Sequence, residues 1–369
     1  MIDGFRGSLS DGANPVCGLL IDSAGNLYGA TPNGGRAGCG VVYRLSPEAG
    51  GGYQESIVHS FNNIPANNDG CNADSYLIFD NAGNLYGTTN KGGGGGVSNT
   101  FCNNGCGTVY KLAPNGAGTL TESVIHSFLG TEGITDGQNP VGGLVLDSAG
   151  NLWGSTPVGG QKGLGTVFEL TPNSDGTFNE SLLYSFTGTS TGFEPNTNLD
   201  IDSAGNLYGT TVNGGLGNGV VFKITPEPDG RVQESVIHQF SLCGATRCPD
   251  GTHPFDGLTI DASGNLYGAV DVGGGAKGDP HDPLMACSGG TVIQGCGVVY
   301  KLSPNAQDGF TESILYRFHG LADGGFPEDD RLGIDASGNI FGTAAEGGSD
   351  ALSNCFGDPG CGVVFEIKP

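Results

Sequence analysis

One eight-residue segment recurs six times along the chain. It reads DSAGNLYG from Asp22, and close copies begin at Asp80, Asp147, Asp202, Asp261 and Asp335. Five periods separate the first copy from the last, so one repeat is about 63 residues long. A fixed period of this kind indicates structural units that bury their apolar faces against their neighbours. The repeat therefore constrains the fold more than any other feature of the sequence.

Each repeat contains four apolar runs of strand length. In the first repeat they are GLLID (18–22), NLYGAT (26–31), CGVVYRL (39–45) and ESIVHSF (55–61). Alternating and β-branched residues, separated by Gly, Asn and Pro, are typical of strands, and no helical periodicity is present. Short connections predict a four-stranded antiparallel meander. Six such units predict an all-β fold, a six-bladed β-propeller of four-stranded antiparallel blades.

The blade boundaries follow from the repeats. We expect a single propeller domain, 1–369, with blades at about 17–61, 75–128, 142–186, 197–240, 256–318 and 330–369. The last blade ends at GVVFEIKP and lacks its fourth strand, whereas MIDGF at the N-terminus matches the tail of VIHSF. We therefore expect residues 1–5 to complete the last blade and close the ring.

The repeated segment itself is predicted to be a structural turn. In this register DSAGN joins the first two strands of a blade, where Gly25 supplies a positive φ and Asp22 and Asn26 bond local backbone. Six turns at blade edges point away from the axis, so they do not converge on a ligand. The motif is predicted to shape the blade and not to bind.

Two other repeat positions carry titratable residues. His59, His126 and His238 share a position with Tyr184 and Tyr316. A position that accepts Tyr is expected to hold a packing residue with a polar tip and not a metal ligand. Acidic residues begin the outer strands, where they discourage pairing between molecules; they are Glu55, Glu122, Glu180, Glu234 and Glu312.

Composition excludes several partners. The chain has 38 acidic and 14 basic residues and a net charge of −24. Such a surface repels nucleic acid and anionic lipid, and leaves cations, neutral glycans and basic proteins as partners. No run approaches the roughly 18 apolar residues that span a bilayer, so we expect no direct membrane insertion. No signal peptide is visible, and we expect that a leader was removed and a start codon added.

Eleven cysteines indicate an oxidising compartment. Irregular spacing and the scarcity of neighbouring histidines favour disulfides over zinc. The expected close pairs are Cys102–Cys106, Cys243–Cys248, Cys287–Cys296 and Cys355–Cys361. Cys39 could pair with Cys71 or Cys17, and the odd count leaves one thiol, which we expect to be Cys17. The sequence thus predicts an extracellular or cell-surface protein.

A family resemblance agrees with this location. LYGTTVNGGLGNGVVFKITP (207–226) and its parallels resemble the GloVer tandem repeats of bacterial secreted or surface-anchored proteins. The resemblance extends over essentially the whole chain. It implies export and repeat architecture, and it implies no catalytic residues. The Asp-x-x-Gly-Asn turn also resembles those of six-bladed NHL and gluconolactonase-like propellers.

Differences between blades point to one face. The loop between the second and third strands and the connection between blades are expected on the same face, and the loop is long at 92–106, 273–296 and 347–361. Three histidines outside the repeat positions also fall there. With neighbouring carboxylates they could act as general acid and base or hold a metal; the catalytic candidates are His253, His281, Asp279, Asp282 and His319. The alternative is a solvated acidic loop set.

A second candidate site lies just before the first strands, nearest the axis. Asp74, Asn198, Asp256 and Asp330 could converge on Ca²⁺, which prefers oxygen ligands. Asn198, Asp256, Asp330 and Arg331 are the candidate ligand-binding residues. Calcium is the one cofactor that the sequence suggests. The alternative is a set of polar residues that hydrate a central tunnel.

Two functional hypotheses remain. The first is a secreted or cell-surface recognition module, a monomer that binds a glycan or a surface protein through the loop-rich face. The second is a carbohydrate- or lactone-directed hydrolase or lyase with its site in the blade 5–6 sector, with calcium as a cofactor. The chain has no serine nucleophile elbow, paired catalytic motif or phosphate loop, which favours binding. An enzyme predicts His253 or His281 facing carboxylates within hydrogen-bond reach.

Overall fold

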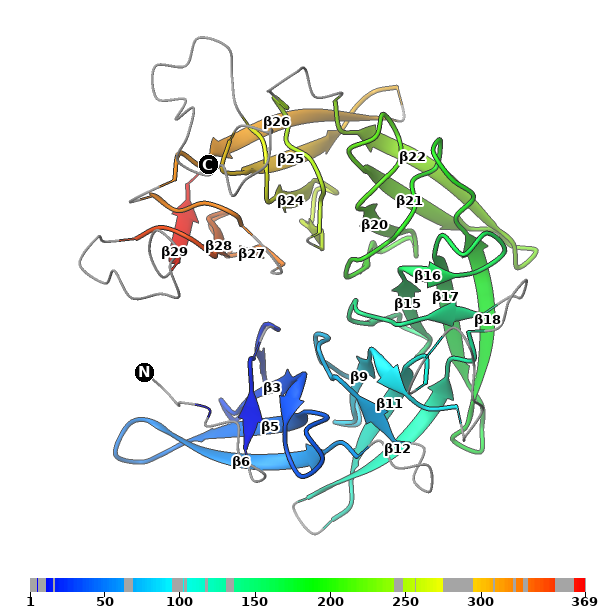
Figure 1. Ribbon diagram of the computed structural model, residues 1–369, viewed down its shortest axis with the longest axis vertical. Helices are drawn as coiled ribbons and strands as arrows, with labels where there is room; N and C mark the ends of the chain where they lie inside the picture. Colours follow the sequence, from blue (N-terminus) through cyan, green and yellow to red (C-terminus); the bar gives the residue numbers. More distant parts are fainter. Residues whose placement is uncertain are drawn as a thin grey trace. The chain divides into compact units, whose positions relative to one another are not determined.

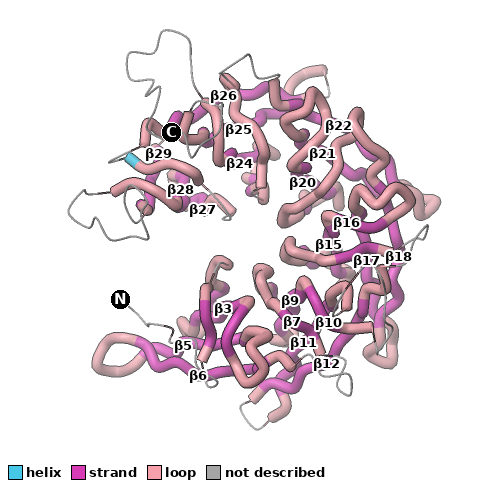
Figure 2. Tube along the Cα trace, viewed as in Figure 1, coloured by secondary structure: helices cyan, strands magenta, loops and turns pink. Residues whose placement is uncertain are grey.

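The computed structural model describes most of the chain (Figure 1). The described residues are 5, 11–15, 17–62, 69–94, 102, 105–116, 119–130, 136–241, 248–255, 257–274, 295–307, 309–320, 323–327, 331–348 and 362–368. Figure 2 shows them as strands and loops, apart from one short helical turn. In this part of the chain no helix has the length and apolar character needed to cross a membrane.

The chain divides into two compact units, Met1–Phe186 and Thr187–Pro369. Each unit contains three of the predicted blades. The fold is all-β and its six blades are those of a six-bladed β-propeller, as the sequence predicts.

The first unit holds blades 1 to 3, each a four-stranded antiparallel sheet. Blade 1 consists of β2 (Leu20–Ile21), β3 (Leu27–Thr31), β5 (Val41–Pro47) and β6 (Tyr53–Ser60). Blade 2 consists of β8 (Ile78–Phe79), β9 (Leu85–Thr89), β11 (Thr108–Pro114) and β12 (Leu120–Ser127). Blade 3 consists of β14 (Val145–Leu146), β15 (Leu152–Thr156), β17 (Thr166–Pro172) and β18 (Phe178–Ser185).

The second unit holds blades 4 to 6. Blade 4 consists of β19 (Asp200–Ile201), β20 (Leu207–Thr211), β21 (Val220–Pro226) and β22 (Val232–Gln239). Blade 5 consists of β23 (Thr259–Ile260), β24 (Leu266–Val270), β25 (Val298–Pro304) and β26 (Phe310–Arg317). Blade 6 has three strands among the described residues, β27 (Gly333–Ile334), β28 (Ile340–Ala344) and β29 (Val363–Ile367).

The blades pack through aromatic rings that recur in register. In blades 1, 2, 4 and 5 the Phe that follows the outer strand meets an aromatic ring on the third strand of the next blade. Phe61 meets Tyr110 at 4.9 Å between ring centroids, and Phe128 meets Phe168 at 5.2 Å, both edge to face. Such pairs stabilise beyond the apolar area that they bury. The repeated aromatic positions are therefore the cores between neighbouring blades.

The N-terminal residue Phe5 follows the same rule. Its ring lies edge-on to Tyr43 of blade 1, with centroids 4.8 Å apart. Phe5 thus occupies the position that Phe61 has toward blade 2, which is the register predicted for MIDGF. Residues 1–4, assigned by the sequence to the fourth strand of the last blade, lie outside the described residues.

The repeated Asp-x-x-Gly-Asn segment is a side-chain-capped turn, as predicted. In blade 4, Oδ1 of Asp202 accepts hydrogen bonds from the backbone N–H groups of Ala204 and Asn206, both at 2.9 Å. Oδ2 accepts from Asn206 Nδ2 at 2.7 Å and from the Tyr208 hydroxyl at 3.0 Å. One carboxylate therefore organises the whole turn and the start of β20. The recurrence of these residue types in every repeat has a local backbone cause.

This turn gives a prediction about acid stability. Burial raises the pKa of Asp202, but hydrogen bonds from Asn206 outweigh it and hold the pKa below its usual value. A depressed folded-state pKa contributes stability above the unfolded pKa, and that stability is lost as pH falls through the folded value. Asp202→Asn should therefore cost about 1–2 kcal/mol at pH 7 and progressively less below about pH 4. Urea titrations at several pH values measure this difference.

The matched control is Asp229→Asn. Asp229 lies in an exposed ion pair with Arg231, with side chains 52% and 80% accessible, so its loss should change stability little. A constant cost of Asp202→Asn from about pH 7 to about pH 2.5 would contradict the role of the ionised carboxylate.

Candidate functional site

Blade connections and second-to-third-strand loops lie together, as the sequence predicts. In the first unit they pair as short ladders: β1 (Gly12–Ala13) with β4 (Asn33–Gly34), β7 (Gly70–Cys71) with β10 (Lys91–Gly92), and β13 (Gly137–Gln138) with β16 (Val158–Gly159). In the second unit isolated bridges join Phe193 to Asn213, Thr252 to Val272 and Gly325 to Glu346. We call the surface formed by these paired loops in each unit its loop face.

Disulfides reinforce the loop face. Cys39 in the loop of blade 1 is bonded to Cys71 in the connection into blade 2, and Cys102 is bonded to Cys106 within a long loop. Cys17 carries a thiol, as expected. Cys248 and Cys296 are each disulfide-bonded, whereas their predicted partners Cys243 and Cys287 lie outside the described residues. The predicted pair Cys355–Cys361 also lies outside them.

A second repeated motif organises every described connection. It is an Asp-Gly pair, or Thr191-Gly192 before blade 4, followed two residues later by a non-glycine residue in the left-handed region. The Asp carboxylates of this motif are Asp11, Asp69, Asp136, Asp250 and Asp323. The left-handed residues are Asn14, Asn72, Asn139, Glu194, His253 and Phe326, with φ between 54° and 60°.

This motif corrects the interpretation of two predicted catalytic histidines. His253 is the left-handed residue before blade 5, and His319 follows the core residue Phe318 as Asn62 follows Phe61. The residue types suggest that both lie outside the repeats, yet both occupy repeat positions of the connection. Both histidines therefore have a structural role in the repeat, and the reason for setting them apart from the repeat holds for neither residue.

The surroundings of His253 are mostly neutral. Its backbone N–H donates to the Asn218 carbonyl at 3.1 Å, its Nδ1 contacts the Thr252 hydroxyl, and its ring stacks near Phe255 at 6.4 Å. Burial lowers the pKa of His253. Among the described residues no carboxylate forms an ion pair with this imidazole. His281, Asp279 and Asp282, predicted as its catalytic companions, lie outside the described residues.

His319 does meet a carboxylate. Its Nδ1 lies 3.1 Å from Oδ2 of Asp323, which also accepts a hydrogen bond from the Tyr316 hydroxyl at 3.0 Å. The His319 side chain is 37% exposed. His319 is therefore the one predicted catalytic residue that the described residues pair with a carboxylate.

Two of the predicted ligand-binding residues are described: Asn198 lies just before β19 and Arg331 just before β27. Arg331 places Nη2 2.7 Å from Oδ2 of Asp200, and its Nε donates to the Leu258 carbonyl. Gly257 lies between Asn198 and Arg331, since a Cβ there would come within 3.1 Å of both side chains. Asp74 lies in the first unit, and Asp256 and Asp330 lie outside the described residues.

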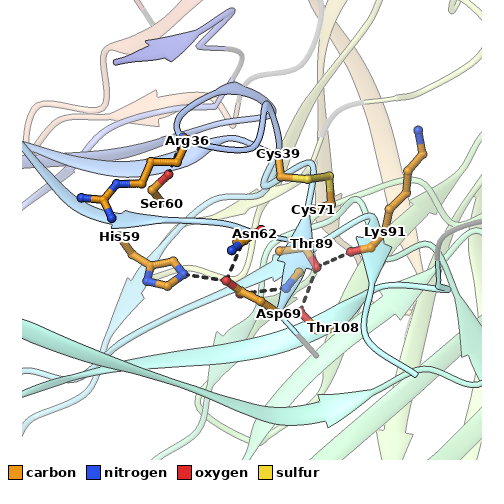
Figure 3. Close-up of polar contacts among 11 residues, drawn as sticks. Arg36, Cys39, His59, Ser60, Asn62, Asp69, Cys71, Thr89, Lys91 and Thr108 are labelled. Carbon is orange, nitrogen blue, oxygen red and sulfur yellow. Dashed lines mark hydrogen bonds and ion pairs between the residues drawn. A yellow bond between two sulfur atoms is a disulfide. The ribbon is translucent and has the colours of Figure 1, made fainter. Parts of the chain in front are cut away.

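Sequence reasoning missed a different cluster, which lies between neighbouring blades (Figure 3). His59 Nε2 of blade 1 lies 3.3 Å from Oδ2 of Asp69 in the connection, and Glu122 of blade 2 completes the set. In the second unit His238 Nε2 lies 3.5 Å from Oε1 of Glu312 and 3.9 Å from Oδ2 of Asp250. In each set the three ligand atoms lie within 4.8 Å of one another.

Local structure positions these side chains. A β-bulge between Val42 and Tyr43, and at the same place in blades 2 to 5, shifts the pairing of the outer strand just before the His position. Bulges redirect side chains. The imidazole of His59 then packs edge-on against Phe61 at 4.7 Å, and His238 packs against Phe240 at 4.9 Å. The predicted packing role is confirmed, and it holds each imidazole toward the carboxylates.

Burial changes the acidity of the clusters. It raises the pKa of Glu122 to about 7, with Asp69 adding to the increase and His59 opposing it. It likewise raises the pKa of Glu312 to about 7, with Asp250 adding and Arg317 opposing. Burial lowers the pKa of His238 despite the opposing effect of Asp250. Each cluster thus carries groups whose charged forms are poorly solvated.

Two other junctions between blades have a similar contact between an outer-strand residue and the Asp of the connection. Between blades 2 and 3, His126 Nε2 lies 3.6 Å from Oδ1 of Asp136, near Glu180, whose pKa burial raises. Before blade 6, Tyr316 replaces the histidine and donates to Asp323. The signal in the sequence was the repeated Asp-Gly pair, which places a carboxylate beside His59, His126, His238 and Tyr316.

Comparisons with known proteins agree with the architecture. Residues 96–279, about half of the chain, match the family model described as the Gloeobacter/Verrucomicrobia repeat. A crystal structure of an ancestral GH74 enzyme is similar, with a TM-score of 0.55 and 11% identity, over 98% of this chain and 42% of that one. At that identity the likeness shows the fold alone, and this chain spans less than half of that enzyme's length. The search of curated proteins finds no match. With its matching repeats and six blades of one pattern, the chain belongs to the Gloeobacter/Verrucomicrobia repeat family.

Proposed function

We propose that this protein is a secreted or cell-surface recognition module that binds a neutral glycan through its loop face. The observation that carries the proposal is the construction of that face. Every described connection between blades is paired with the neighbouring loop. The second strands of blades 2 to 5, β9, β15, β20 and β24, are buried along their whole length. Loops held on a rigid scaffold are where binding residues are usually found.

Charge and cysteine chemistry support the class of ligand and the location. A net charge of −24 disfavours anionic polymers, so an uncharged polysaccharide is the better partner among glycans. The Cys39–Cys71 and Cys102–Cys106 disulfides are compatible with an oxidising compartment outside the cytoplasm. A basic surface protein is the alternative partner of the same face.

A hydrolase or lyase is the second candidate. The His319–Asp323 pair supports it, because a carboxylate that holds an imidazole is a common part of general acid–base sites. Against it, Asp323 also holds the His319 backbone N–H, which is the role that Asp69 has toward Asn62 and Asp250 toward Ser241. The pair is thus accounted for by the connection motif, and recognition is the function that the geometry supports better.

A glycan array followed by product analysis tests the proposal. We expect binding to one class of neutral glycan with no change in the mass of the bound glycan. Arg36→Ala combined with Lys91→Ala, both exposed on the loop face of the first unit, should weaken binding at least tenfold, about 1.4 kcal/mol. Asn81→Ala, in the turn at the opposite end of blade 2, should leave affinity unchanged.

Three outcomes would count against the proposal. Release of shorter sugars would identify an enzyme. A blank array together with binding to a basic surface protein would assign the face to protein recognition. An equal loss of affinity in the Asn81 variant and the loop-face variant would remove the assignment of binding to the loop face.

A further inference from the structure

The two complete His–Asp–Glu clusters suggest metal binding, a role that is independent of glycan binding. We propose that His59, Asp69 and Glu122, and likewise His238, Asp250 and Glu312, form two structural Zn²⁺ sites, each joining one blade to the next. Each set takes one ligand from an outer strand, one from the connection and one from the following outer strand.

The distances fit tetrahedral zinc. Bonds of about 2.0–2.2 Å to nitrogen and oxygen at tetrahedral angles place ligand atoms roughly 3.3–3.5 Å apart. His59 Nε2 and Asp69 Oδ2 are 3.3 Å apart, and His238 Nε2 and Glu312 Oε1 are 3.5 Å apart. His238 Nε2 and Asp250 Oδ2 are 3.9 Å apart, and all three ligand atoms of each set lie within 4.8 Å of one another. Closing the wider separations to about 3.5 Å would bring each set around one ion.

Several polar atoms of the clusters have no hydrogen-bond partner among the described residues. They are buried, and they include Oε1 of Glu122, Oε1 of Glu312, Nε2 of His238 and Oδ1 of Asp250. Asp250 is only 6% exposed. An unsatisfied buried polar atom is costly, so such groups usually face a water or an ion. A cation between Nε2 of His238 and Oε1 of Glu312 would satisfy both atoms.

The carboxylates and imidazoles are held in place by further contacts. Oδ2 of Asp69 accepts from the Asn62 N–H at 3.0 Å, and Oδ2 of Asp250 accepts from the Ser241 N–H at 2.8 Å. The rings of Phe61 and Phe240 fix the imidazoles from the side. Contacts of this kind orient metal ligands before the ion arrives.

The type of ligand atoms favours zinc over calcium and magnesium. One imidazole and two carboxylates suit Zn²⁺ and its neighbours among transition metals, whereas Ca²⁺ and Mg²⁺ prefer six or more oxygen ligands. Three protein ligands leave one position for water. The sites join adjacent blades within each unit and are distinct from the calcium site considered near the axis. A protonated histidine paired with the carboxylates is the competing explanation.

Metal analysis of the purified, tag-free protein tests the sites. The protein is stripped with chelator, incubated with ZnCl₂, dialysed and analysed by mass spectrometry. We expect two ions per chain in the wild type, one in His59→Gln, one in His238→Gln and none in the double variant. His126→Gln, at the looser junction, should keep both ions. The melting temperature should rise with Zn²⁺ in the wild type but not in the double variant, since binding to the native state stabilises it.

Two controls keep the test decisive. Circular dichroism checks that each variant folds, and Glu122→Gln, which keeps the shape of the side chain, replaces His59→Gln if that variant fails. Absence of retained zinc in the wild type would show that the clusters are not zinc sites. Equal zinc content in the double variant and the wild type would place the ions elsewhere, and either result would overturn the proposal while leaving glycan recognition untouched.

Discussion

Gly107→Ala is expected to lower the free energy of unfolding by more than about 3 kcal/mol. Gly107 precedes β11 with φ +100°, a conformation that L side chains rarely adopt. A Cβ there would lie 2.4 Å from the Thr89 carbonyl oxygen and 2.6 Å from Cδ of Pro140. Backbone and a proline ring cannot rotate away, so the chain itself would have to move.

Hydrogen bonds oppose that movement. The Gly107 N–H donates to the Gly92 carbonyl, and its own carbonyl accepts from the Phe128 N–H, each at 3.0 Å. A shift at Gly107 would disturb the loop of blade 2 and the buried Phe128 that packs against blade 3. Equilibrium urea unfolding measures the loss of stability, and failure of the variant to fold is the extreme form of the same result.

Gly94→Ala is the matched control. Gly94 is in the same loop and also has a positive φ, +76°, but no described atom lies within 4 Å of the position that a Cβ would take there. Its cost should be only the backbone strain, about 1 kcal/mol. Equal destabilisation by the two substitutions would mean that φ alone, and not close approach of the chain, demands glycine at Gly107.

The fold was predictable because its rules are local. Asp202 and its equivalents cap their own turns, and the apolar residues of strands such as β21 are buried. Even the register of the N-terminal segment could be inferred, because Phe5 repeats the position of Phe61. These features depend on short stretches of sequence and on repetition.

The clusters between blades were not predictable in this way. His59 and Glu122 are 63 positions apart, about one repeat, and the sequence does not show that a bulge turns the imidazole toward the next blade. The exchange of His for Tyr suggested packing alone. The structure shows that Tyr316 keeps the contact to its Asp through a hydroxyl, so the exchange preserves a polar interaction.

The repeat position of His253 was not visible in the sequence for a different reason. Its repeat position holds Asn, Glu or Phe in other connections, so side-chain identity concealed the repeat. The position shares a left-handed backbone in every described connection. Within each unit its N–H also bonds the preceding blade, as His253 bonds Asn218 and Asn139 bonds Cys106. A backbone requirement of this kind leaves little trace in the residue types.

Removing the Cys39–Cys71 disulfide is expected to cost about 3.7 kcal/mol, from the loop-entropy relation for its sequence separation of 32. The same relation gives about 1.9 kcal/mol for Cys102–Cys106, with a separation of 4. Both bonds lie on the loop face of the first unit. The double serine variant of Cys102 and Cys106 is therefore a matched control for the double serine variant of Cys39 and Cys71. Urea unfolding of the two double variants measures the difference.

The longer bond should also affect binding. Cys71 lies in β7, which pairs with β10, so the bond links the loop of blade 1 to the ladder that carries Lys91. Without it, ligand binding must order two loops that the wild type already holds together, and affinity for the glycan should fall. Stability that falls equally in both variants would contradict the entropic account, because the two loops differ eightfold in length. Unchanged glycan affinity after loss of Cys39–Cys71 would show that the ordered connection of blade 2 takes no part in recognition.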